Sequence, residues 1–417
     1  ARRLAYGARE YNREVVVVDG VPGPPVDRIR YRSLRFSPDG RRFAYVADMA
    51  GRQQVVIDGI AYPEVAAIGT EGPLFSPDGN RFAYVAMNEG KEFVTVDGLE
   101  GELFDAIIPG SLVFSPDGKR YAFAARRGDK GVVVVDGKAG DWYDGIMVGT
   151  PVFSPDGKRF AYGARKADRH SVVIDGIPGP EFDSLGRDML KFSPDGSRLA
   201  YAASRNGHWH LVVDGTLGPE FEGIVADSIT FSPDGKRLAY LAGSGGRQRV
   251  VVDGKIGPAC DFHPATRLRF SPDGRRFAYA LARDGRWQVS VDGELGPFYD
   301  AIADGSPLFS PDGSRVAYVA KRQNSMVMVM DGREAGEWDG ILSGTPVFST
   351  DGKRIAYAVA TEKQRRMIVE GTVGPDFAAI LVAPVVCADG FLRYLAAEQT
   401  AAGLMLVAVE VPGFGYK

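Results

Sequence analysis

The sequence predicts an all-β fold, a β-propeller of about ten four-stranded blades, on the strength of three observations. The phrase Phe-Ser-Pro-Asp-Gly recurs every 39 residues, at Phe36, Phe75, Phe114, Phe153, Phe192, Phe231, Phe270 and Phe309, and returns as Phe-Ser-Thr-Asp-Gly at Phe348. A second phrase, Val-Asp-Gly or a close variant, keeps the same step from Asp19 to Glu370. The segments between these phrases have the length and composition of short strands separated by turns. A strict period near forty indicates one structural unit that is stacked repeatedly.

Residues 111–149 illustrate the first three strands of one repeat. Ser111–Phe114 is a short strand, and the following Ser-Pro-Asp-Gly has the composition of a β-turn, with Pro presetting the backbone. Arg120–Ala125 and Val132–Val135 are apolar on both faces, as strands are when sheets cover them on each side. Packed propeller blades have this property.

The fourth strand is expected around Asp141–Ile146, and it carries Gly and acidic residues, with Gly-Pro in other copies such as Gly179-Pro180. Proline cannot donate to a strand ladder, so this strand is predicted at the outer edge of each blade. The predicted order from the channel outward is therefore the strand before Ser-Pro-Asp-Gly, the Ala-Tyr strand, the Val-Asp-Gly strand and the Gly-Pro strand.

The chain ends predict how the ring closes. The N-terminal repeat (Arg3–Ala8, Glu14–Asp19 and a strand near Pro24) lacks an innermost strand, and the C-terminal repeat (a strand near Val385, then Leu392–Ala397 and Leu404–Glu410) lacks an edge strand. We therefore expect one domain, residues 1–417, whose ring is closed by a blade built from both termini. Two middle strands are left over in this count, and eleven blades or an incompletely closed ring is the alternative.

Composition excludes several classes of function. With 50 basic and 53 acidic residues the net charge is −3, which does not favour a nucleic acid partner, and no stretch is apolar enough to span a membrane. Cys260 and Cys387 are expected to be small apolar substitutes rather than a disulfide or a metal pair. No cofactor is predicted, and we expect a monomer. The chain begins Ala-Arg-Arg, so a signal peptide is expected to be absent or already removed.

The phrase Phe-Ser-Pro-Asp-Gly-Lys-Arg-(Phe/Leu)-Ala-Tyr resembles the TolB-like β-propeller repeat, a relative of the WD repeat, over essentially the whole chain. This chain departs from that pattern in its third strand, which ends Val-Val-Val-Asp-Gly. The family includes scaffolds, receptors and domains attached to peptidases, so the resemblance implies architecture more than activity. It also implies a bacterial protein in the periplasm or exported, with a cytoplasmic location as the alternative.

The constant turns predict two rings of carboxylates on one face. One ring includes Asp39 and Asp117, and the other includes Asp58 and Asp136. Calcium sites are one interpretation, but an Arg follows each Ser-Pro-Asp-Gly aspartate by three residues, as Arg42 follows Asp39. Turn chemistry and Asp–Arg pairing are therefore the preferred interpretation.

The loops that vary between repeats predict a ligand-binding rim on the opposite face. Its candidate residues are Arg126, Arg127, Arg165, Arg169, His170, Arg205, His208, Trp209, Arg247, Arg286, Trp287 and Arg322. An acidic partner could bind there, such as a peptide, an anionic glycan or a nucleic acid strand. The alternative is a solvated rim whose cations pair with acidic residues that recur near the end of the edge strand, including Asp105, Asp144 and Asp183.

Three further positions are predicted to face the channel, and catalytic signals are lacking. Arg35, Lys191 and Arg269 precede the recurring Phe and would give the channel a partly basic wall. His208 and His210 would share one face of a strand, but an isolated loop pair is preferred over a metal site. There is no Gly-x-Ser-x-Gly elbow and no phosphate-binding glycine loop, so no catalytic residue is assigned.

The sequence thus favours a non-enzymatic scaffold that holds a protein or peptide, or an anionic ligand, on its variable basic loops. Loops that differ on otherwise identical blades are how repeat proteins vary recognition. One alternative is a hydrolase or lyase at the channel mouth that acts on an acidic polymer. Another is a purely structural module produced by recent internal duplication.

Overall fold

The computed structural model describes residues 3–187, 189–261, 267–362, 364–401 and 403–414. The chain falls into two compact units, Ala1–Glu220 and Phe221–Lys417, and each is described by itself. Apart from one 3-10 turn, η1 (Tyr31–Ser33), the regular structure of the described residues is β-strand. Within these ranges no helix is long and apolar enough to cross a membrane.

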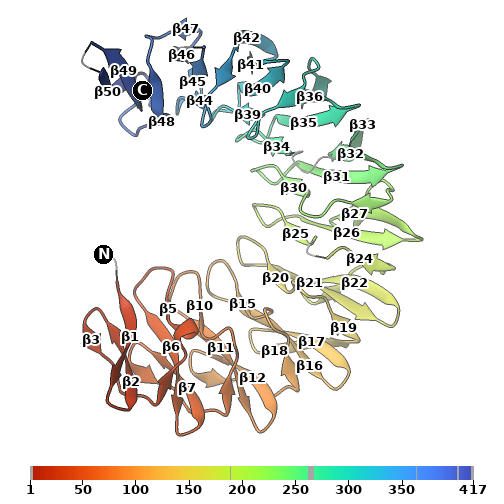
Figure 1. Ribbon diagram of the computed structural model, residues 1–417. Helices are drawn as coiled ribbons and strands as arrows, with labels where there is room; N and C mark the ends of the chain where they lie inside the picture. The colour runs from red at the N-terminus through yellow and green to blue at the C-terminus, as the bar shows by residue number, and fades with distance from the viewer. Residues whose placement is uncertain (1–2, 188, 262–266, 363, 402, 415–417) are drawn as a thin grey trace. The chain divides into compact units, whose positions relative to one another are not determined.

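The first unit contains six antiparallel sheets in chain order (Figure 1). Their strands are β1 (Ala5–Glu10), β2 (Arg13–Val18), β3 (Val21–Pro22); β4 (Arg28–Ile29), β5 (Arg35–Phe36), β6 (Phe43–Met49), β7 (Arg52–Ile57), β8 (Ile60–Ala61); β9 (Ala67–Ile68), β10 (Leu74–Phe75), β11 (Phe82–Asn88), β12 (Lys91–Val96), β13 (Leu99–Glu100); β14 (Ala106–Ile107), β15 (Val113–Phe114), β16 (Tyr121–Arg127), β17 (Lys130–Val135), β18 (Lys138–Tyr143); β19 (Gly145–Ile146), β20 (Val152–Phe153), β21 (Phe160–Lys166), β22 (Arg169–Ile174), β23 (Ile177–Pro178); and β24 (Ser184–Leu185), β25 (Lys191–Phe192), β26 (Leu199–Arg205), β27 (His208–Val213), β28 (Thr216–Leu217).

The second unit contains five sheets of the same kind among its described residues. Their strands are β29 (Gly223–Ile224), β30 (Thr230–Phe231), β31 (Leu238–Ser244), β32 (Arg247–Val252), β33 (Lys255–Cys260); β34 (Arg269–Phe270), β35 (Phe277–Arg283), β36 (Arg286–Val291), β37 (Glu294–Leu295); β38 (Ala301–Ile302), β39 (Leu308–Phe309), β40 (Val316–Arg322), β41 (Ser325–Met330), β42 (Arg333–Trp338); β43 (Gly340–Ile341), β44 (Val347–Phe348), β45 (Ile355–Ala360), β46 (Arg365–Val369), β47 (Thr372–Val373); and β48 (Ala379–Val386), β49 (Phe391–Thr400), β50 (Gly403–Pro412).

The predicted order of strands within a repeat is confirmed. In the third sheet β10 pairs with β11, β11 with β12, and β12 with β13, so the strand before Ser-Pro-Asp-Gly and the strand after Val-Asp-Gly lie at opposite edges. A further short strand, β9, pairs with the second half of β11. The innermost position is therefore shared by two short strands, which the sequence pattern did not predict.

The predicted edge strand at Asp141–Ile146 is wrong in its boundaries. Lys138–Tyr143 forms the edge strand β18 beside β17, whereas Gly145–Ile146 forms β19 and pairs with β21 of the following sheet. Asp144 is thus the point at which the chain passes from one sheet to the next. The physical reason is that the backbone groups of Gly145 and Ile146 still need hydrogen-bond partners after the chain has left its own sheet. The strand within reach is β21 of the next repeat.

Each Ser-Pro-Asp-Gly turn is held by its own side chains. The Ser115 hydroxyl donates to Oδ1 of Asp117 (2.6 Å) and accepts from the backbone N–H of Arg120 (2.9 Å), which closes the turn. Gly118 has φ of +73°, a conformation that glycine adopts without steric cost. Serine, aspartate and glycine therefore each have a structural task in this turn.

The core of each unit lies between successive sheets. Phe123 and Val132, from the fourth sheet, pack with Ala83 and Val94 of the third and with Phe104, which lies between the two sheets in the chain. All are buried, which explains why the middle strands are apolar on both faces.

Within each unit an arginine joins one sheet to the next, and its partner corrects the predicted Asp–Arg pairing. Arg120 Nε donates to Oδ2 of Asp136 (2.9 Å), across the hairpin, rather than to Asp117 in its own turn. Arg120 Nη1 donates to the carbonyl oxygen of Lys158 in the following repeat (2.8 Å). The guanidinium carbon also lies 5.6 Å from the centroid of the Phe153 ring. One side chain thus holds its own hairpin, the next turn and an aromatic ring.

This arrangement recurs, and we call these residues the joint arginines. Each donates both to the Val-Asp-Gly aspartate sixteen residues later and to a carbonyl 38 residues later: Arg3, Arg42, Arg81, Arg120, Arg159, Arg237, Arg276 and Arg315. The separation of 38 residues is one less than the repeat, so a constant repeat length keeps every joint in register.

The chain ends form two three-stranded sheets, β1–β3 and β48–β50. As predicted, the first has no innermost strand and the last has no edge strand after β50 among the described residues. Closure by a blade shared between both ends, and with it the number of blades and the single domain, stay predictions.

The joint predicts a large loss of stability on removal of one arginine. Arg120→Ala should lower the free energy of unfolding by about 1–3 kcal/mol, because charged hydrogen bonds to Asp136 and Lys158 disappear together. Arg120→Lys should recover less than half of this loss, because an ammonium group lacks the planar fork that reaches both partners. Urea unfolding measures both, with exposed Lys119→Ala as the control. Equal effects of Lys119→Ala and Arg120→Ala would contradict the joint.

The Ser-Pro-Asp-Gly turns predict acid sensitivity. Hydrogen bonds from Ser193 and Ser197 lower the pKa of Asp195 from 3.8 to about 2. The equivalent serine lowers the pKa of the corresponding aspartate in every other copy: Asp39, Asp78, Asp117, Asp156, Asp234, Asp273, Asp312 and Asp351. A carboxyl with a lowered pKa in the folded state stabilises the fold above its unfolded pKa, and this stabilisation is lost as the pH falls through the folded value.

The unfolding midpoint in urea should therefore be level above about pH 5 and fall steeply between about pH 4 and pH 2. Serine hydrogen bonds are the main cause, so added salt should leave the position of this fall unchanged. A fall that begins near neutral pH, or one that moves with salt, would contradict this assignment.

Candidate functional site

Most loops between the second and third strands are two-residue hairpin turns, and an acidic residue fixes several of them. Asp144 Oδ2 accepts from the N–H of Ala167, and Asp183 Oδ2 accepts from the N–H of Asn206, both at 2.6 Å. Asp300 does the same for Gln323. The acidic residues that recur near the edge strand therefore cap the hairpins of the sheet that follows.

The same carboxylates also bind cations, as the solvated-rim alternative predicted. Lys91 Nζ lies 2.5 Å from Asp105 Oδ1, and Lys130 and Arg169 make equivalent ion pairs with Asp144 and Asp183. The hydrogen bond from Lys130, followed by that from the Ala167 N–H, lowers the pKa of Asp144. Arg169 is thus engaged by its own repeat.

Most of the other predicted rim arginines are also engaged. Arg127 donates to Oε1 of Glu102 (2.7 Å), a partner that sequence reasoning missed and that an acidic residue after the edge-strand glycine could have signalled. Arg165 donates to the carbonyl oxygens of Asp144 and Ala167, at 3.1 Å each. Arg322 pairs with Glu334 and Glu337.

Three further rim arginines lie against neighbouring groups. Arg205 lies 4.9 Å from the centroid of the Phe182 ring and Arg286 lies 5.5 Å from that of Phe298. Arg247 forms an ion pair with Asp284 of the next hairpin (3.2 Å). These arginines cover aromatic surface or join loops.

The predicted histidines and tryptophans differ in their exposure to solvent and in their hydrogen bonds. His208 is exposed, whereas the neighbouring Trp209 is half-buried and His210 is buried, with Nδ1 2.9 Å from the carbonyl oxygen of Gly218. His170 Nδ1 lies 3.0 Å from the carbonyl oxygen of Asp183, and Trp287 is half-buried. Across the described ranges, no three His, Cys, Asp or Glu side chains are grouped as metal ligands.

Two exposed cations remain at the hairpin ends of adjacent sheets. Arg126 is the residue before Arg127, which ends β16, and Lys166 is the last residue of β21. Among the described residues neither side chain has a hydrogen bond or an ion pair. We call residues 126–130 and 165–169 the basic hairpin ends; they carry six cations and two acidic residues, Asp129 and Asp168.

The three positions predicted to face a channel differ in their surroundings. Arg35 is exposed and lines a cavity beside β10, and Lys191 is exposed on β25. Arg269 is half-buried on β34, and its Nε has no partner among the described residues. Burial, with Arg267 nearby, lowers the pKa of its guanidinium. Their position on a channel wall stays a prediction.

No family model matches the chain, and no curated relative was found. Among solved structures, the chain is similar to an eukaryotic initiation factor (15% identity, 81% of this chain and 96% of that chain, TM-score 0.37). It is also similar to TolB from Acinetobacter baumannii (20% identity, 53% and 62% covered, TM-score 0.25) and to the Dos1 propeller (13% identity, 72% and 89% covered, TM-score 0.31). The repeat and the strand pairings, rather than these values, establish an all-β array of antiparallel sheets. The chain resembles TolB-like and WD-type β-propellers, as its repeat phrase implies.

Proposed function

We propose that this protein is a non-enzymatic binding scaffold whose basic hairpin ends hold an acidic segment of a protein partner. The observation that carries the proposal is the pair of exposed cations without partners, Arg126 and Lys166, on adjacent sheets. Neighbouring cations at equivalent ends, such as Lys130 and Arg169, are already paired within the fold.

Unpaired charge at these ends is available for a partner at little desolvation cost. Arg165 donates to two backbone carbonyls, so its charge is not neutralised by a carboxylate. With Arg126 and Lys166 it gives three cations whose charge is not balanced by an ion pair on two successive hairpins. An acidic peptide would meet a complementary potential, which increases the rate of association and orients the partner.

An aromatic contact lies beside these cations. Trp142, on the edge strand β18, is 38% exposed, and the Arg127 guanidinium carbon lies 5.3 Å from its ring centroid. Tryptophan and arginine are the residue types most enriched at the centres of protein interfaces. Their presence favours a peptide over a ligand bound by charge alone.

The proposal predicts salt-sensitive binding of acidic peptides that depends on particular cations. Fluorescence anisotropy with a library of Glu-rich and Asp-rich peptides should identify a binder at low salt, weakened at high salt. Arg126→Ala with Lys166→Ala should raise its Kd about tenfold, as expected for two contacts that each contribute about 0.7 kcal/mol.

A matched control tests whether the location of the charge matters. Arg41→Ala with Lys119→Ala removes the same charge from exposed side chains at the opposite ends of sheets. It should leave the Kd within about twofold, because Debye screening at 0.15 M salt acts over about 8 Å. Equal weakening by both double variants, or no binding of any acidic peptide, would refute the proposal. Tighter binding of an anionic glycan than of any peptide would refute the choice of a protein partner.

A further inference from the structure

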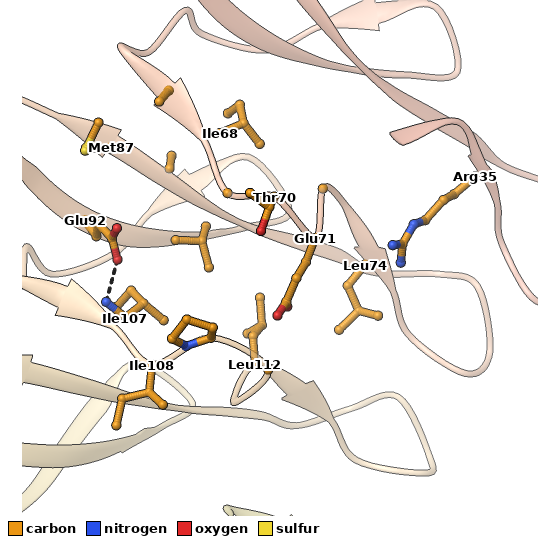
Figure 2. Close-up of a pocket in the computed structure, with 17 residues that line it drawn as sticks. Arg35, Ile68, Thr70, Glu71, Leu74, Met87, Glu92, Ile107, Ile108 and Leu112 are labelled. Carbon is orange, nitrogen blue, oxygen red and sulfur yellow. Dashed lines mark hydrogen bonds between the residues drawn. The ribbon is translucent and has the colours of Figure 1, made fainter. Parts of the chain in front are cut away.

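A cavity of about 300 Å³ lies in the first unit beside the short strands β9 and β10 of the third sheet (Figure 2). Its apolar wall comes from Ile68, Leu74, Val85, Ile107 and Leu112. Cavities that bind small ligands begin at about this volume, and they are mostly apolar with a few placed polar groups.

Two glycines, Gly69 and Gly72, line the cavity at positions where other repeats carry larger residues. Gly69 occupies the position that carries a longer side chain in most other described copies, namely Arg30, Ile108, Met147, Val225 and Leu342. Gly186 also lacks a side chain there, but Met189 lies against it, and the cavity that Gly186 lines is smaller, at about 160 Å³. At the position of Met189, the third sheet has Gly72. Both the usual side chain and the substitute are therefore missing.

The second glycine also removes a hydrogen-bond acceptor. In other repeats a serine hydroxyl accepts from a backbone N–H in the middle of the second strand: Ser33 from Val46 (2.8 Å), Ser111 from Ala124 (3.0 Å) and Ser228 from Leu241 (3.0 Å). The equivalent N–H here belongs to Val85, and the equivalent residue is Gly72, which has no hydroxyl. Val85 lines the cavity, and its carbonyl oxygen is already used by the N–H of Gly69 (2.9 Å). A ligand oxygen could accept from this donor in place of serine.

Two opposite charges stand at the same cavity. Figure 2 shows the Glu71 side chain extending between Leu74 and Leu112, with Arg35 beside Leu74. Both charged side chains are exposed, and within the described ranges neither forms an ion pair. The other carboxylate in the lining, Glu92, accepts from the N–H of Ile107 (2.6 Å) and is thus part of the wall.

From this combination we propose that the cavity binds a small hydrophobic zwitterion, an aliphatic amino acid or dipeptide. Its side chains would lie among Ile68, Leu74 and Leu112. Its carboxylate would face Arg35, its ammonium group would face Glu71, and one of its oxygens would accept from the N–H of Val85. An apolar interior with a cation and an anion at its mouth is complementary to a hydrophobic zwitterion. A fatty carboxylate, by contrast, would provide no cation to pair with Glu71.

Isothermal titration with leucine and Leu-Leu tests the proposal. We expect binding of at least one of them at millimolar concentration or tighter. Acetylated Leu-Leu, which has no ammonium group, and Leu-Leu amide, which has no carboxylate, should each bind at least fivefold more weakly. Equal binding of hexanoate and leucine would overturn the zwitterion, and no binding of leucine or Leu-Leu would overturn the site.

Variants locate the binding within the cavity. Gly69→Ile with Val85→Ala copies the Ile108 and Ala124 pair of the next repeat, so it fills the cavity with a combination that this fold already accommodates. It should reduce affinity at least tenfold with an unchanged circular dichroism spectrum. Unchanged affinity in this variant would overturn the site.

Charge variants keep the test valid if the filled variant does not fold. Glu71→Gln should weaken binding of Leu-Leu about fivefold without affecting acetylated Leu-Leu, and Arg35→Gln should do so without affecting Leu-Leu amide. Lys191→Gln is the matched control, because Lys191 holds the position of Arg35 in another repeat. A loss in Lys191→Gln equal to that in Arg35→Gln would contradict the assignment.

Discussion

The sheets of each unit depend on one side chain that reaches in two directions. A joint arginine such as Arg120 binds the aspartate that ends its own third strand and a carbonyl of the next turn, and it covers an aromatic ring between them. The aspartate in turn accepts from the backbone of the second strand, as Asp136 does from the N–H of Tyr121. Hairpin, turn and neighbouring sheet are therefore fixed together. Apolar packing between sheets supplies most of the favourable burial, but it is non-directional. The directional hydrogen bonds of the arginine fix the register of one sheet against the next.

Much of this fold could be predicted because its information is local and repeated. Turn residues and strands that are apolar on both faces identify the elements and their order without knowledge of long-range contacts. The errors arise where partners lie far apart in the sequence. Arg42 is three residues from Asp39 but pairs with Asp58, because the hairpin brings a residue sixteen positions away across the strand. The edge strand was misplaced for a similar reason, since the partner of Gly145–Ile146 belongs to the following repeat.

The candidate site shows the same limit more strongly. Sequence comparison between repeats finds the loops that vary, and hence Arg126, Arg169 and their neighbours, but it does not distinguish a free cation from a paired one. That difference depends on whether an acidic side chain such as Asp183 or Glu102 lies within reach on another strand. The cavity at Gly69 was missed because glycines were interpreted only as turn residues, and not as positions where a side chain is missing. Comparing each position with its equivalents in the other copies would have revealed both glycines.

Because every joint is made by residues that are constant in each copy, and reaches only into the next copy, the repeats are interchangeable parts. Each copy supplies the arginine and aspartate that meet the following copy, and it supplies a backbone carbonyl to the arginine of the preceding copy. That carbonyl is present whatever the side chain. Unequal recombination between gene segments of one repeat length would therefore add, remove or exchange whole sheets while preserving the hydrogen bonds of the joint arginines. Variation in loops and in positions such as Gly69 and Gly72 can accumulate in one copy and then be moved along the array intact.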